Sequence, residues 1–129
     1  MELEHTNENP KLLVVEDDDG ARAALGDILD LEGYNVALSA NGAEALDYLH
    51  NEPLPDLIIL DLQMPVMNGW QFRREQIKIA EFAAVPVIVI TAFQSAGDID
   101  VREIVHKPID IERLLALIRQ LLLAVHSYN

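Results

Sequence analysis

The sequence predicts an α/β protein, a doubly wound sheet of five parallel strands with helices on both faces. Short apolar runs alternate along the chain with segments whose apolar residues recur at helical spacing, which predicts strand and helix in turn. Three of the runs are continuously apolar, as is typical of strands buried on both faces of a parallel sheet. The crossovers between such strands are right-handed, and ligands bind beyond the carboxyl ends of the strands.

The first predicted strand consists of the apolar residues 12–15 and is followed by four consecutive acids. Asp18 or Asp19 can cap the helix that follows, whose apolar residues lie at helical spacing. Gly33 is a natural end for that helix, because glycine readily adopts the left-handed conformation. Apolar and polar residues then alternate over 34–38, which predicts an edge strand.

The middle of the chain continues the same alternation. Asn41 can cap a short helix that ends before Pro53. Residues 56–61, with the sequence Asp-Leu-Ile-Ile-Leu-Asp, form the second buried strand. A loop then leads to a helix that we expect to begin at Gly69 and to reach about Ile79.

The third buried strand is predicted at 86–90 and ends at Thr91. A weaker strand at 102–106 leads to Pro108, which lies at the entry of the last helix, and Asp110 begins that helix. Its apolar residues recur on one face, which predicts packing against the sheet. They are Ile111, Leu114, Leu115, Ile118, Leu122 and Val125.

Length and composition indicate one domain. The chain has 129 residues, half of them apolar, which suits a single core. We expect a disordered tail at 1–10, a domain at 11–126 and a C-terminal tail at 127–129. There is no cysteine, so disulfides and thiolate zinc sites are excluded. No apolar run reaches the roughly 18 residues of a membrane span, and the start does not resemble a secretory signal, so a cytoplasmic location is expected.

The charge of the chain is strongly negative and unevenly distributed. The net charge is −13, and residues 1–65 carry all of the excess, with 15 acids and two bases. Residues 66–129 carry seven acids and seven bases. A domain this acidic repels phosphate backbones, so we expect no binding to nucleic acid.

Polar residues gather at the predicted carboxyl ends of the strands. Counting all five predicted strands, Glu16 and Asp17 follow the first strand, at 12–15, and Asp61 ends the third, at 56–61. Thr91 ends the fourth strand, at 86–90, and Lys107 follows the fifth, at 102–106. Three carboxylates brought together repel one another unless a cation neutralises them, and Mg²⁺ suits carboxylates, water and phosphate oxygens. A carboxylate nucleophile, a metal and a lysine are the parts needed for phosphoryl transfer.

Four segments, in this order, resemble the receiver domain of bacterial two-component response regulators. They are LLVVEDDDGAR at 12–22, LIILDLQMPVMNGW at 57–70, VIVITA at 87–92 and HKPID at 106–110. The match runs from Lys11 to about Val125. This resemblance implies a flavodoxin-like fold with strand order 2-1-3-4-5.

The resemblance also implies a role for each of the polar residues. Asp61 is implied to accept a phosphoryl group from a sensor histidine kinase or a phosphotransfer protein. Mg²⁺ is implied to bind Glu16, Asp17, Asp61 and the carbonyl of Gln63. Thr91 is implied to be the hydroxyl that turns toward the phosphoryl group, and Lys107 to contact that group, with a cis bond to Pro108.

The sequence departs from the family in the region that usually signals. Only about ten residues, 92–101, remain for the crossover between the last two strands, so the fourth helix is expected to be shortened or absent. Ile104 occupies the position, three before the lysine, where receivers often carry an aromatic residue. We therefore expect an atypical output face toward a downstream protein that the sequence does not identify.

The last helix carries a second apolar stripe, formed by Leu117, Leu121, Ala124 and Tyr128. An exposed stripe of this kind often marks an interface, so it could mediate a homodimer or partner docking. Ordinary core packing in a thin domain is the alternative.

Two other functions compete with a phosphorylation switch. One is a receiver-like interaction module that works independently of phosphate. The other is an aspartyl-phosphate hydrolase, but such enzymes use a second aspartate two residues after the nucleophile, and Gln63 stands there. We therefore expect no enzymatic activity of that kind.

Overall fold

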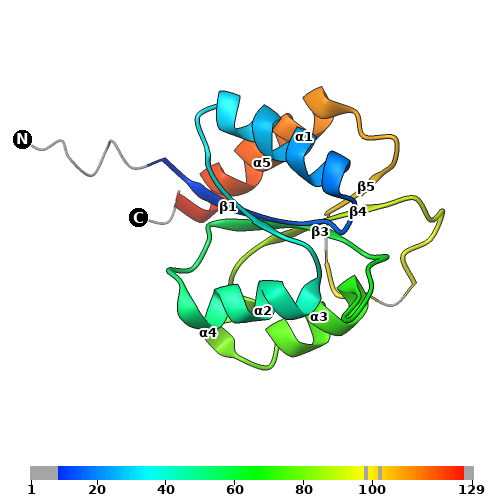
Figure 1. The fold of residues 1–129 in the computed structure, drawn as a ribbon. Coiled ribbons are helices and arrows are strands. Elements are labelled where there is room, and N and C mark those ends of the chain that lie inside the picture. Colours follow the sequence, from blue (N-terminus) through cyan, green and yellow to red (C-terminus); the bar gives the residue numbers. More distant parts are fainter. Residues whose placement is uncertain (1–8, 98, 102, 127–129) are drawn as a thin grey trace, which may run out of the picture.

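The computed structural model describes residues 9–97, 99–101 and 103–126, and it confirms the predicted fold class. Five strands form one parallel sheet in the order β2-β1-β3-β4-β5 (Figure 1). The strands are β1 (Lys11–Val15), β2 (Asn35–Ser39), β3 (Leu57–Asp61), β4 (Val87–Thr91) and β5 (Glu103–His106). The helices are α1 (Asp19–Leu31), α2 (Gly42–Asn51), α3 (Gly69–Gln76), α4 (Ala80–Ala83) and α5 (Ile111–His126).

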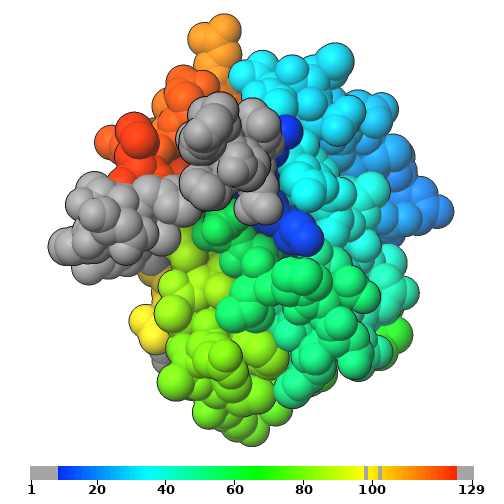
Figure 2. Space-filling view, turned by 90° about the vertical axis from the view of Figure 1, so that its left-hand side faces the viewer, coloured from blue at the N-terminus to red at the C-terminus, as the bar shows by residue number. Residues whose placement is uncertain are grey.

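Helices cover both faces of the sheet. Figure 1 shows α1 and α5 on one face and α2, α3 and α4 on the other. The two layers are also visible in Figure 2, which views the molecule from the end where β1 begins. Successive residues of a strand point to opposite faces, so Leu12 and Val14 belong to one buried cluster and Leu13 and Val15 to the other. This two-sided burial explains the continuous apolar runs.

Capping side chains fix where the first three helices begin. Asp18 caps α1 by accepting the backbone N–H of Ala21 at 2.7 Å, so the alternative cap, Asp19, lies inside the helix. Asn41 caps α2 as predicted. Asn68 caps α3, and Gln71 completes a capping box by accepting the N–H of Asn68.

The prediction of one helix from Gly69 to about Ile79 is wrong. The helix α3 ends at Gln76, and a separate short helix, α4, follows. The buried side chain of Gln76 donates to the carbonyl of Phe82 at 2.8 Å and to that of Val85 at 3.3 Å. These bonds hold α4 and the residues after it against the end of α3. The periodicity of apolar residues does not predict them, because they join a polar side chain to backbone carbonyls.

Replacing Gln76 with leucine is expected to destabilise the protein by about 1–3 kcal/mol. Leucine fills similar space but leaves the carbonyls of Phe82 and Val85 without this donor in the core. Urea denaturation of Gln76→Leu against the wild type measures the change. An unchanged midpoint would show that these carbonyls find other partners.

No helix connects β4 to β5 in the described parts of the connection, 92–97 and 99–101. The described residues agree with the expectation of a shortened or absent fourth helix of the family, and α4 of this chain lies before β4 instead. The peptide bond between Lys107 and Pro108 is cis, as the resemblance implies.

The last helix packs its predicted core stripe against the sheet. Leu114, Ile118 and Leu122 are buried, whereas the side chain of Val125 lies outside the described residues. In the second stripe, Leu117 and Leu121 are partly buried against the same core, and Tyr128 is outside the described residues. Homodimer formation through this helix stays a prediction.

The predicted tails at 1–10 and 127–129 fall outside the described residues except for Asn9 and Pro10. Among the residues that are described, no helix is long and apolar enough to cross a membrane.

Candidate functional site

The sheet brings the predicted polar residues to one edge. Glu16 and Asp17 directly follow β1, Asp61 is the last residue of β3, Thr91 is the last of β4, and Lys107 directly follows β5. Adjacent strands end at nearly the same level, since Val15 pairs with Leu60, Asp61 with Ile90 and Thr91 with His106. The strand ends therefore place groups that are 91 residues apart in the sequence within contact distance.

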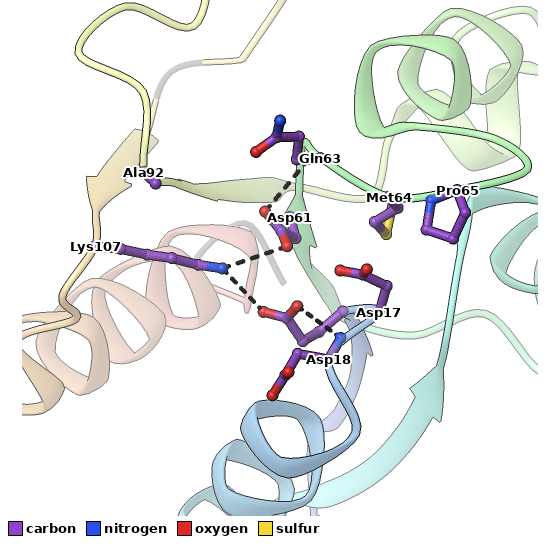
Figure 3. Close-up of a pocket in the computed structure, with 9 residues that line it drawn as sticks. Asp17, Asp18, Asp61, Gln63, Met64, Pro65, Ala92 and Lys107 are labelled. Atoms are coloured by element: carbon purple, nitrogen blue, oxygen red, sulfur yellow. Dashed lines mark hydrogen bonds and ion pairs between the residues drawn. The ribbon is translucent and has the colours of Figure 1, made fainter.

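These residues surround a cavity of about 450 Å³. It is lined by Glu16, Asp17, Asp18, Asp61, Gln63, Met64, Pro65, Ala92 and Lys107. Figure 3 shows Lys107 reaching across the cavity toward Asp61. Its ammonium Nζ lies 3.2 Å from Glu16 Oε1 and 3.3 Å from Asp61 Oδ2, so one cation pairs with two buried carboxylates.

Three carboxylates in the site could hold a metal ion. One oxygen from each of Glu16, Asp17 and Asp61 lies within 4.8 Å of the others. Glu16 is 2% exposed and Asp61 is 4% exposed, whereas Asp17 is open to solvent. Because Lys107 supplies only one positive charge near three carboxylates, a divalent cation suits this donor set.

The electrostatics of Glu16 reflect this crowding. Burial raises the pKa of its carboxyl, the N–H of Asp18 acts in the opposite direction, and the carboxylate of Asp61 adds to the rise. Burial lowers the pKa of Lys107, but the carboxylates of Asp61 and Glu16 outweigh this and hold the pKa above its usual range. The carboxylates of Glu16 and Asp61 therefore favour a further cation in the site, beside the ammonium group of Lys107.

The other two predicted residues differ in where they lie. Gln63 lines the cavity, and its backbone N–H lies 3.5 Å from Asp61 Oδ1. Thr91 is 2% exposed, and its Oγ1 accepts the N–H of Phe93 at 3.0 Å. Among the described residues, Ala92 and not Thr91 lines the cavity.

The sequence alone does not identify Gly69 as a residue that lies against Asp61. Gly69 donates its N–H to the carbonyl of Leu62 at 2.9 Å, and a Cβ at this position would lie 2.6 Å from the carbonyl oxygen of Asp61. Only glycine lets α3 begin this close to the end of β3. The identity of Gly69 at the predicted helix start was the available signal, but its closeness to Asp61 is visible only in the fold.

Replacing Gly69 with alanine is expected to destabilise the protein by about 1–3 kcal/mol, because the added methyl group meets backbone atoms that cannot turn away. We also expect the strand end at Asp61 to shift. Thermal unfolding measures the first effect, and amide chemical shifts around Asp61 measure the second. Gly20→Ala is the matched control, since a Cβ there meets only the side chain of Asp18 at 3.6 Å.

Comparison with known proteins identifies the family. A family model described as the response regulator receiver domain matches residues 12–119. The chain belongs to this family. Its described fold also matches the receiver domain of the sensor histidine kinase PA1611 from Pseudomonas aeruginosa, with a TM-score of 0.82 and 25% identity over 88% of this chain and 98% of that one. That structure has a magnesium ion coordinated in its active site cleft.

Two curated receiver proteins are similar in sequence. The response regulator Rre1 of Synechocystis is 36% identical over 118 residues, covering 86% of this chain and 51% of that protein. This chain thus spans about half the length of that relative and of several others it matches. The polar-differentiation response regulator DivK of Brucella anthropi is 32% identical over 117 residues, covering 86% of this chain and 94% of that protein.

Proposed function

We propose that this receiver domain is a phosphorylation-dependent signalling switch that accepts a phosphoryl group on Asp61. The observation that carries the proposal is the position of Asp61. Its carboxylate ends β3 in a cavity where Lys107 Nζ lies 3.3 Å away and two further carboxylates lie close by. The proposed donor is a phosphohistidine of a sensor histidine kinase or a phosphotransfer protein.

We propose that Mg²⁺ binds Glu16, Asp17, Asp61 and the carbonyl of Gln63. The crowding of the carboxylates supports this, and so does the magnesium ion in the similar receiver domain from Pseudomonas aeruginosa. When bound, Mg²⁺ neutralises negative charge on the carboxylates and on the incoming phosphoryl oxygens.

The protein's own residues supply the rest of the reaction. A carboxylate oxygen of Asp61 attacks the phosphorus of the donor, a P–O bond forms, and the P–N bond to the donor imidazole breaks. The electron pair of that bond stays on the imidazole nitrogen, which takes a proton from solvent. Lys107 already contacts Asp61, so its ammonium is positioned to pair with a phosphoryl oxygen, and the hydroxyl of Thr91 can donate to another.

Mass spectrometry after incubation with a small phosphodonor tests the proposal. Intact protein incubated with acetyl phosphate and Mg²⁺ is expected to gain one phosphoryl group, and protein incubated with a chelator is expected to gain none. Absence of the group under both conditions, with no change on adding beryllium fluoride, would support the phosphate-independent interaction module. Release of phosphate in many turnovers would instead indicate a hydrolase.

A further inference from the structure

The connection between β4 and β5 begins with a hydrogen bond to the predicted switch residue. Thr91 Oγ1 accepts the N–H of Phe93 at 3.0 Å. Thr91 is not among the described residues that line the cavity, so its hydroxyl must turn to reach a group on Asp61. Turning the side chain removes the acceptor from the N–H of Phe93, and a backbone donor without its partner drives the local backbone to rearrange.

Phe93 links this hydrogen bond to α3. Its ring lies against the indole of Trp70, with ring centroids 6.0 Å apart. The indole N–H of Trp70 donates to the carbonyl of Ala96 at 2.7 Å, and Nε of Arg73, one turn further along α3, donates to the carbonyl of Asp100 at 2.8 Å. The described connection is thus attached to α3 at two points, on the side of the sheet where Figure 1 shows that helix.

The position that is aromatic in many receivers is aliphatic here, since Ile104 occupies it. Ile104 pairs with Val89 in the sheet and packs partly buried against the core. Its aliphatic side chain has no polar atom with which to bond a hydroxyl. Thr91 therefore cannot signal through a hydrogen bond to this side chain.

We propose that Thr91, Phe93 and Trp70 form the path by which the state of Asp61 reaches the β4–β5 connection and α3. The inference rests on the proposed function, because it needs a group bound at Asp61. When the hydroxyl of Thr91 turns into the cavity, Phe93 is released, its ring moves relative to Trp70, and the bond from Trp70 to Ala96 changes. The output surface is then α3 with the described residues of the β4–β5 connection, 92–97 and 99–101.

Fluorescence of Trp70 tests the path, because it is the single tryptophan of the chain. The whole chain is titrated with beryllium fluoride in the presence of Mg²⁺, and binding is followed separately by the fluorine NMR signal of the bound fluorides. We expect the emission of Trp70 to change in step with the appearance of the bound fluorine signal.

Variants of Phe93 separate a path from a merely structural contact. Phe93→Leu is expected to keep the bound fluorine signal and to lose most of the emission change, and Phe93→Tyr is expected to restore it. Phe82→Leu is the matched control, since the same substitution falls on a buried ring that packs against His50. Ile104→Val is expected to leave the emission change intact.

The two readouts distinguish failure of this inference from failure of the proposed function. A bound fluorine signal with unchanged emission, or a full emission change in Phe93→Leu, overturns the path while Asp61 remains the proposed acceptor. No bound fluorine signal in the wild type overturns the proposed function, and the path with it.

Discussion

Replacing Asp61 with asparagine is expected to abolish incorporation of the phosphoryl group from acetyl phosphate. The amide oxygen is a far weaker nucleophile than a carboxylate, and the other carboxylates of the site, on Glu16, Asp17 and Asp18, come from the segment that follows β1. Intact mass spectrometry in the presence of Mg²⁺ measures the loss. Full incorporation in Asp61→Asn would show that another residue accepts the group and would contradict the proposed function.

The same substitution is expected to raise the free energy of unfolding of the metal-free protein by about 1 kcal/mol. Lys107 keeps Glu16 as a partner at 3.2 Å, and the neighbour that adds to the raised pKa of Glu16 loses its charge. Denaturant unfolding with a chelator present measures this. A large loss of stability would show that Asp61 contributes more as a partner of Lys107 than it costs as a neighbour of Glu16.

Asp56→Asn is the matched control for both measurements. Asp56 lies just before the opposite end of β3, where its Oδ2 accepts the N–H of Lys11 at 2.8 Å. Asparagine retains an oxygen that can accept this bond. The control variant is therefore expected to be phosphorylated as the wild type is.

The arrangement of the strand ends could be predicted from the sequence because the fold class determines it. Parallel strands bring their carboxyl ends to one edge, so residues that follow buried apolar runs must meet there. The runs ending near Glu16, Asp61 and Thr91 are continuous and therefore distinctive. Their convergence needed no knowledge of helix packing.

Contacts between elements could not be predicted in the same way. Two side chains illustrate this. Gln76 donates to the carbonyls of Phe82 and Val85, six and nine residues away, and Trp70 donates to the carbonyl of Ala96, 26 residues away. Such bonds depend on tertiary geometry, because any carbonyl can accept them. The same limit applies to Gly69. A side chain there would collide with the carbonyl oxygen of Asp61 at the end of β3, and this contact exists only in the folded protein.

Replacing Lys107 with methionine is expected to destabilise the metal-free protein by about 2 kcal/mol. This effect is smaller than that of breaking a fully buried ion pair, because the lysine is partly exposed to solvent. Methionine has similar length but leaves Glu16 and Asp61 buried without their ammonium partner. We expect Mg²⁺ to restore part of the loss, since it supplies positive charge to the same carboxylates. Denaturant unfolding with Mg²⁺ and with a chelator measures both effects.

Lys78→Met is the matched control for the loss of an ammonium group. Its Nζ lies 2.8 Å from Glu75 Oε2, but the lysine side chain is 65% exposed. Exposed pairs of this kind contribute roughly 0–1 kcal/mol. An equal effect of the two substitutions would show that burial of the carboxylates at the Lys107 site has no energetic consequence.

The pH dependence of the Lys107→Met difference provides the strictest test of the charge argument. The folded pKa of Lys107 is raised, so its contribution is fully present below the unfolded value of 10.5 and is lost as pH rises through the folded value. The folded pKa of Glu16 is also raised, so the folded protein loses stability as pH rises from 4.5 through this folded pKa and Glu16 becomes ionised. Because Lys107 lowers the pKa of Glu16, removing Lys107 raises the folded pKa of Glu16 further. The difference between variant and wild type should therefore be largest near about pH 8 and smaller near about pH 5, where Glu16 binds a proton more readily in the variant. A difference that stays constant over this range would mean that the substitution acts through packing and not through charge.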